Sequence, residues 1–250
     1  MPSPSLPSVA VLPSAAAAVP LLLGEVRRLL TGSARPGLGF ATGATFTAFL
    51  RALGDAGSHG GMPLERLWTT HLDEYLGFPP ERRGGMVHEL EGLCPPLQQW
   101  RQQGRFLPVP SDGAEASLQA HEQRLAELGG VGLQLLGIGR NGHLAFNEPG
   151  TSFDRGFHVT TLAATTRQDA RARFAPDEPP QQAVTSGLAT ILRAQRLVLC
   201  AFGRQKAAAV RGMLTGEVGP HCPASVLRRH DNAHVLLDAE AASEWRASGS

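Results

Sequence analysis

The stretch from Leu135 to Phe153 gathers the residues best suited to chemistry. It runs from an apolar segment through several glycines to Asn141, His143 and Glu148. A histidine can transfer protons near neutral pH, and a nearby carboxylate and amide can orient it. A buried strand that ends in glycines and polar residues is how an open α/β sheet builds a site at its carboxyl edge. This density of polar groups favours a catalytic loop over a solvated surface loop.

A further carboxylate, Asp73, follows the predicted strand 67–72. A carboxylate at the carboxyl end of a strand is a candidate general acid or base, because it faces the edge where such sheets bind ligands. A solvated loop acid is the alternative. Taken alone, the sequence around Asp73 leaves both interpretations open.

A turn suited to an anion follows another predicted strand, 38–41. The segment Thr42, Gly43, Ala44 and Thr45 leads from this strand into a helix that ends near Leu53. Free backbone N–H groups and the helix dipole make such a turn attractive to an anion. The turn matches neither a Walker loop nor a dinucleotide-binding pattern, so it does not indicate a nucleotide.

Lysine occurs once in the chain, at Lys206, although lysine and arginine together number 23. Position 206 falls where an apolar strand passes into a helix. A compact ammonium group suits a phosphate that is held by a point charge. The alternative is that this one lysine survived a compositional bias towards arginine by chance.

Elements of alternating type must position these residues. We predict strands at 8–12, 38–41, 67–72, 133–138, 196–202 and 233–237. Helices are expected at about 14–30, 86–93, 114–128, 186–193, 206–214 and 239–245, besides the one that ends near Leu53, with Ser14 and Thr185 as caps. Strands that alternate with helices predict a three-layer, doubly wound α/β fold with a mostly parallel, Rossmann-like sheet. The segment from about 153 to 180 is long and polar, which favours a lid over the site.

Length and composition narrow the class of protein. A chain of 250 residues with a net charge of +1 fits one α/β domain, with residues 1–7 expected to lack fixed structure. No basic run points to nucleic acid, and no stretch reaches the ~20 apolar residues of a membrane span. Pro13 and Pro20 interrupt an N-terminus without a positive start, so no signal peptide is expected. Cys94, Cys200 and Cys222 show no metal or disulfide spacing, which favours a reducing cytoplasm.

Several motifs in order resemble the glucosamine-6-phosphate deaminase/isomerase family over nearly the whole chain. They are ATGATF at 41–46, HLDEYLG at 71–77, GIGRNGHLAFNEPGTSF at 137–153, TTRQDARARF at 165–174, GRQKAAAV at 203–210 and CPASVLRRH at 222–230. The resemblance implies the fold of that family and a small hexosamine 6-phosphate as substrate. It also implies that neither a metal nor an organic cofactor is needed.

The resemblance assigns a role to each candidate residue. Asp73 takes the proton from C2 of the sugar, and His143 opens the sugar ring with help from Asn141 and Glu148. The reaction is an aldose–ketose isomerisation with deamination, which gives fructose 6-phosphate and ammonia. The phosphate-binding residues that the resemblance implies are Thr42, Gly43, Ala44, Thr45, Arg167 and Lys206.

The chain departs from the family pattern at one residue and in one segment. Many members have aspartate where this chain has Asn141, so Glu148 must carry more of the stabilisation of a histidine cation. The segment 81–86 also differs, which leaves the preferred amino sugar open. The alternatives are a 6-phosphogluconolactonase, an enzyme for galactosamine 6-phosphate, and a non-catalytic sugar-phosphate sensor.

Regulation by a second phosphate site is not expected. In allosteric family members, such a site uses basic residues soon after the FNEPG run. Here the stretch 152–160 offers Arg155 and His158 but no matching Arg/Lys pair. The sequence therefore predicts a monomer or small homo-oligomer with hyperbolic kinetics and no activation by N-acetylglucosamine 6-phosphate.

Overall fold

The protein is described from a computed structural model that covers residues 6–58 and 61–247. Of the N-terminal residues expected to lack fixed structure, 1–5 lie outside the described residues. Among the described residues, no helix is both long and apolar enough to cross a bilayer.

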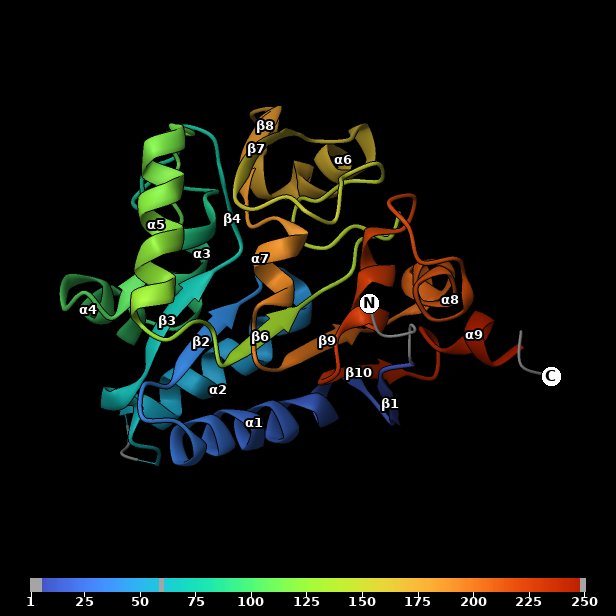
Figure 1. Cartoon of the computed structure of the whole chain (residues 1–250), viewed down its shortest axis with the longest axis horizontal. Coiled ribbons are helices and arrows are strands. Elements are labelled where there is room, and N and C mark those ends of the chain that lie inside the picture. Colours follow the sequence, from blue (N-terminus) through green and yellow to red (C-terminus); the bar gives the residue numbers. More distant parts are fainter. Residues whose placement is uncertain (1–5, 59–60, 248–250) are drawn as a thin grey trace.

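A large sheet forms the centre of the molecule (Figure 1). Its strand order is β1-β10-β9-β6-β2-β3-β5, and every neighbouring pair is parallel. The strands are β1 (Ser8–Leu12), β2 (Gly37–Phe40), β3 (Trp68–His71), β5 (Phe106–Leu107), β6 (Leu133–Leu136), β9 (Leu197–Ala201) and β10 (Ala233–Asp238). The inner strands β2, β6 and β9 are buried along their whole length, as expected for a parallel sheet that is covered on both faces. The mostly parallel sheet predicted from the sequence is confirmed.

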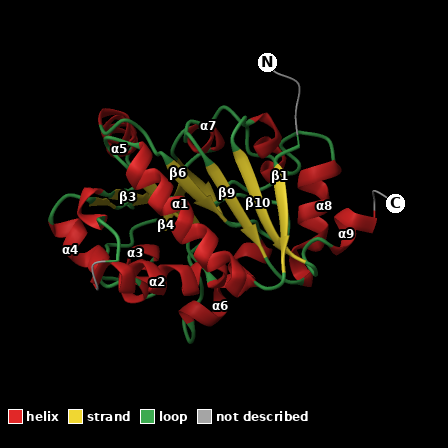
Figure 2. Cartoon of the chain, turned by 90° about the horizontal axis from the view of Figure 1, so that it is seen from below, coloured by secondary structure: helices red, strands yellow, loops and turns green. Residues whose placement is uncertain are grey.

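Helices cover both faces of this sheet, and Figures 1 and 2 show α1 and α2 on one side and α7 on the other. In α1, buried residues recur every four positions, at Ala18, Leu22, Val26 and Leu30, so that one stripe of the helix faces the sheet. The helices other than α6 are α1 (Ala18–Gly32), α2 (Thr47–Ser58), α3 (Met86–Leu93), α4 (Pro96–Gln102), α5 (Glu115–Glu127), α7 (Leu188–Leu192), α8 (Ala207–Thr215) and α9 (Ser243–Ala247). The predicted three-layer arrangement is confirmed, although α4 and β5 were not predicted.

A small antiparallel sheet lies apart from the large one, in the upper part of Figure 1. Its order is β4-β8-β7, with β4 (Asp73–Tyr75), β8 (Gln182–Thr185) and β7 (His158–Thr161). The helix α6 (Ala164–Phe174) follows β7. The segment predicted to form a lid, 153–180, therefore contains a strand and a helix.

Both predicted helix caps are wrong. Ser14 precedes a 3₁₀ turn before α1, but its side chain forms no capping hydrogen bond. Thr185 belongs to β8, where it lies opposite Asp73, and Gly187 is the residue before α7. The hydroxyl of Thr185 instead accepts a hydrogen bond from the backbone N–H of Phe146 at 3.1 Å. Threonine is a common helix cap, but here long-range contacts place Thr185 in a strand and use its hydroxyl as an acceptor.

Candidate active site

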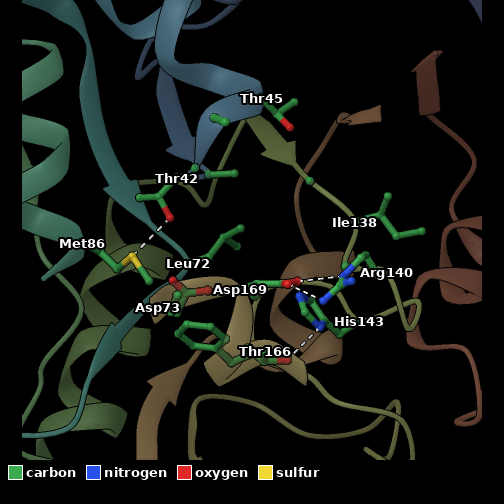
Figure 3. A pocket seen from close by; sticks show the side chains of 18 of the residues that line it. Thr42, Thr45, Leu72, Asp73, Met86, Ile138, Arg140, His143, Thr166 and Asp169 are labelled. Atoms are coloured by element: carbon green, nitrogen blue, oxygen red, sulfur yellow. Dashed lines mark hydrogen bonds and ion pairs between the residues drawn. The ribbon is translucent and has the colours of Figure 1, made fainter. Parts of the chain in front are cut away.

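A cavity of about 720 Å³ opens at the carboxyl edge of the large sheet and collects most of the predicted site residues. Figure 3 shows these side chains converging from the turn after β2, the start of β4, the loop after β6 and the helix α6. The predicted residues that line the cavity are Thr42, Gly43, Ala44, Thr45, Asp73, His143 and Lys206. Segments distant in sequence therefore form one site, as expected of an open α/β sheet.

The loop after β6 holds the ring of His143 against the backbone. A Cβ added at Gly139 would lie 2.3 Å from the ring, so only glycine leaves room for the histidine at this position. Gly142 has a φ of 85°, a conformation that side chains rarely adopt. The side-chain oxygen of Asn141 accepts the backbone N–H of His143 at 3.2 Å. The glycines and the asparagine thus fix the histidine by local contacts.

Glu148 is the centre of the polar contacts around the histidine. Its Oε2 lies 3.5 Å from Nδ1 of His143 and accepts a hydrogen bond from Nδ2 of Asn141 at 2.8 Å. Its Oε1 accepts the hydroxyl of Thr166 at 2.6 Å and the backbone N–H of Ala163 at 3.2 Å. Asn141 and Glu148 therefore reach the cavity through His143, as orienting groups.

These contacts decide the charge of Glu148. Burial has the largest single influence on the pKa of Glu148 and raises it. Hydrogen bonds from His143, Thr166 and Asn141, with the charge of His143, outweigh burial and bring this pKa down to about 2. Glu148 is thus an anion throughout the neutral range, and it lies beside the imidazole of His143.

Asp73 lies in a different environment, at the first position of β4. Only 7% of the residue is exposed, and it lines the cavity. Burial has the largest influence on the pKa of Asp73 and raises it, Glu74 and Glu89 also raise it, and Arg173 lowers it; together they bring this pKa to about 7. A carboxyl group poised near neutrality can take up and return a proton in one reaction cycle.

Lys206 and the turn 42–45 also line the cavity. The Nζ of Lys206 donates a hydrogen bond to the backbone oxygen of Ile138 at 2.7 Å. Burial lowers the pKa of Lys206, Asp169 raises it and Arg140 lowers it. Arg140 and Asp169 form an ion pair at the edge of the cavity (Figure 3).

The structure does not bring Arg167 to the cavity. In the described chain, Arg167 is absent from the lining, and its Nη2 lies 3.9 Å from Oε2 of Glu178. The same helix instead directs Thr166, Asp169 and Arg173 into the cavity. The sequence analysis missed Arg173, Asp169 and Arg140. Helical spacing shows that positions 166, 169 and 173 share one face of a helix, but only the tertiary structure shows that this face lines the cavity.

Fold and site together define a class: an α/β protein in which Asp73, His143 and the turn 42–45 share a cavity at the carboxyl edge of a parallel sheet. A family model described as glucosamine-6-phosphate isomerases/6-phosphogluconolactonase matches residues 13–236. The chain belongs to this family. The resemblance drawn from the sequence motifs is confirmed.

Curated relatives match over most of their length. Glucosamine-6-phosphate deaminase from Geobacillus sp. (strain WCH70) is 40% identical over 214 residues, which cover 82% of this chain and 83% of the relative. Glucosamine-6-phosphate deaminase 1 from Bacillus subtilis (strain 168) is 39% identical over 209 residues, which cover 82% of this chain and 86% of the relative.

Solved structures agree with the fold. A monomeric glucosamine-6-phosphate deaminase is 33% identical and matches with a TM-score of 0.85 over 95% of this chain and 99% of its own. A 6-phosphogluconolactonase from Trypanosoma brucei matches with a TM-score of 0.76 but is only 19% identical, over 96% of this chain and 99% of its own. At that identity the likeness shows the fold alone.

Proposed function

We propose that the protein is a glucosamine-6-phosphate deaminase, which converts glucosamine 6-phosphate and water into fructose 6-phosphate and ammonia. One observation carries the proposal. Asp73, with a pKa raised to about 7, and His143, paired with an anionic Glu148, face one cavity that also holds Lys206. The relatives named glucosamine-6-phosphate deaminase support the choice of substrate.

His143 opens the sugar ring in this mechanism. The imidazolium form donates a proton to the ring oxygen, the bond between C1 and this oxygen breaks, and the C1 hydroxyl gives its proton to water, so that the open aldehyde results. Glu148 stabilises the imidazolium because it remains ionised and lies 3.5 Å from Nδ1. Thr166 and Asn141 hold Glu148 in place, so the ring keeps its orientation during the proton transfer.

Asp73 then moves a proton between two carbons. Its carboxylate takes the proton from C2, which gives an enolamine, and returns it to C1, which gives a ketose imine. Water adds to C2 of this imine, and the C2–N bond breaks to release ammonia. Proton uptake and return are equally accessible to a carboxyl group whose pKa is near 7.

The phosphate anchors the other end of the sugar in this proposal. Lys206 supplies a cation, and the turn 42–45 supplies neutral donors. Arg140 also lines the cavity, and its charge acts on Lys206. Arg167 is not part of the anchor, because it pairs with Glu178. Binding energy at the phosphate fixes the reacting carbons against Asp73 and His143.

The helix α6 forms a lid in this proposal, as expected for the segment 153–180. Its Thr166, Asp169 and Arg173 line the cavity, and each bonds to a different residue outside the helix. Release of these contacts would open the cavity to substrate, and their return would exclude water.

The proposal also includes the oligomeric state and the compartment: the protein is a monomer and works in the cytoplasm. The matching solved deaminase is described as monomeric and is covered over 99% of its chain. The three cysteines are free and buried, which fits a reducing compartment. Light scattering of the purified protein, with rate curves with and without N-acetylglucosamine 6-phosphate, would test for a monomer with hyperbolic kinetics.

The decisive experiment is an assay of ammonia release with glucosamine 6-phosphate, galactosamine 6-phosphate and unphosphorylated glucosamine, beside hydrolysis of 6-phosphogluconolactone. We expect fastest release from glucosamine 6-phosphate. Lys206→Ala should raise KM for this substrate and have little effect on glucosamine, because the lost contact is to phosphate. Lactone hydrolysis without ammonia release would overturn the proposal, and binding without turnover of any substrate would indicate a sensor.

A further inference from the structure

The carboxylate of Glu89 joins three elements that surround the candidate base. Glu89 lies in the first turn of α3. Its Oε1 accepts the backbone N–H of Gly43, in the anion turn, at 3.1 Å, and its Oε2 pairs with Nη2 of Arg173, in α6, at 2.6 Å. One side chain therefore holds the turn after β2 and the lid helix together.

Arg173 pairs with the carboxylate of Glu89 and also acts on that of Asp73 through its charge. Its guanidinium forms its ion pair with Glu89 and donates from Nη1 to the sulfur of Met86 at 3.0 Å. Arg173 and Asp73 both line the cavity, and the charge of Arg173 acts on the carboxyl of Asp73. Among the described residues, the structure contains no ion pair between these two. Glu89 itself does not line the cavity.

We propose that Glu89 is a positioning residue that keeps the guanidinium of Arg173 in the cavity wall and off the carboxylate of Asp73. This inference deepens the proposed function, because it concerns the base of that reaction. Glu89 acts through Arg173 and Gly43 without touching the substrate.

The physical reason is a competition for one cation. An arginine paired directly with Asp73 would stabilise its ionised form and weaken it as a base. Such a pair would also block the approach of the sugar carbon. Glu89 offers the guanidinium a stronger partner, because its carboxylate is already fixed by the N–H of Gly43. The arginine therefore remains close enough to hold the lid but does not neutralise the base.

Other charged groups around Asp73 also influence its pKa. Glu74 neighbours it on β4, and three hydrogen bonds, from the backbone N–H groups of Tyr75, Met86 and Val87, hold the Glu74 carboxylate at the start of α3. The side chains that interact electrostatically with the carboxyl of Asp73 are Glu74 and Tyr75 (β4), Glu89 (α3) and Arg173 (α6), and His71 (β3) interacts with its backbone.

Two substitutions should move the titration of Asp73 in opposite directions. Glu89→Gln removes an anion and frees Arg173 to approach, so the midpoint for Asp73 should fall by about one pH unit. Arg173→Met removes the cation, so the midpoint should rise by a similar amount. The measurement is a ¹³C NMR titration of aspartate-labelled protein, with Asp73→Asn to assign the signal. It needs no substrate, so its outcome is independent of the proposed function.

Activity supplies a second readout. Glu89→Gln should lower kcat at pH 8 by about tenfold, part of the ~10²–10⁴-fold that a general base supplies, with a smaller change in KM. Glu91→Gln is the matched control, because Glu91 lies on the same helix and pairs with Arg101. We expect its titration and kcat to equal those of the wild type.

The inference is overturned if folded Glu89→Gln leaves the Asp73 midpoint unchanged or raises it. If that variant does not fold, Glu89→Asp keeps the charge but shortens the reach, and a smaller downward shift is expected. Absence of ammonia release by the wild type would overturn the proposed function alone, because the NMR titration would still report on Asp73.

Discussion

Asp73 and Glu148 are two carboxyl groups of one site, yet their surroundings shift their pKa values in opposite directions. Asp73 begins β4, where the described chain offers its carboxylate no hydrogen-bond donor, and burial raises its pKa to about 7. Glu148 ends the loop after β6, where side chains and a backbone N–H donate to it, and its pKa is about 2. Burial penalises both carboxylates, and the donors decide which one stays ionised.

The difference matches the two tasks that the proposed reaction requires. A group that accepts and returns a proton must be near neutrality, whereas a group that stabilises a histidine cation must remain charged.

The largest effect is expected from Asp73→Asn. The amide cannot accept the C2 proton, so turnover should fall by ~10²–10⁴-fold while binding of the sugar phosphate persists. In the wild type, kcat/KM should rise as pH passes upwards through about 7, because the base must lose its proton first. Initial rates of ammonia release from pH 5.5 to 9 measure both. Asp154→Asn, an exposed acid, is the control. Near-normal turnover of the Asp73 variant would remove this residue from the mechanism.

Glu148→Gln removes the fixed anion beside His143. The imidazolium loses its charged neighbour, so turnover should fall by roughly tenfold to a hundredfold, within the range for impaired acid–base catalysis. The alkaline limb of the pH–rate profile should also move to lower pH. Rate profiles of this variant and of the exposed control Glu127→Gln provide the comparison. A pH profile identical to that of the wild type would show that Glu148 does not support the cation.

Thr166→Val takes one donor from Glu148 but leaves its charge. A hydrogen bond to a charged group is worth about 1.5–3 kcal/mol, so the free energy of unfolding should fall by about this amount at pH 7. Because the folded-state pKa of Glu148 is depressed, this stabilisation is present above about 4.5 and is lost as pH falls towards about 2. Denaturant titrations at pH 7 and pH 3, with Thr165→Val as the exposed helix control, test the dependence. An equal loss at both pH values would contradict it.

The smallest effect is a gain in stability from Asp73→Asn. The pKa of Asp73 is raised on folding, so its ionisation opposes the folded state increasingly as pH rises from 3.8 towards about 7. The variant escapes this cost, and a gain of roughly 0.5–2 kcal/mol at pH 8 is expected. Thermal unfolding at pH 5.5 and pH 8 should show a larger gain at pH 8. A variant less stable than the wild type at pH 8 would contradict the expectation that ionised Asp73 destabilises the folded state.

Local sequence determined one half of the site. The loop from Gly139 to Glu148 brings His143, Asn141 and Glu148 together within ten positions, and the Asn141–Glu148 hydrogen bond spans only seven. Short-range contacts need only the right residues and glycines at the right spacing. The alternation of apolar segments likewise predicted the parallel sheet, because buried strands of such a sheet must be apolar on both faces.

Only the tertiary structure decided the other half. Asp73 follows an ordinary strand in the sequence, but it starts β4 and pairs with Thr185 in a separate antiparallel sheet. Which arginine of α6 faces the cavity depends on how the helix is rotated against the walls, and this favours Arg173 over Arg167. Strand partners and helix rotation are set by packing against residues far away in the chain, so neither can be read from the neighbouring sequence. The same long-range packing buries Asp73 and brings Glu89 to Arg173, and through burial and charge it determines how strong a base the site contains.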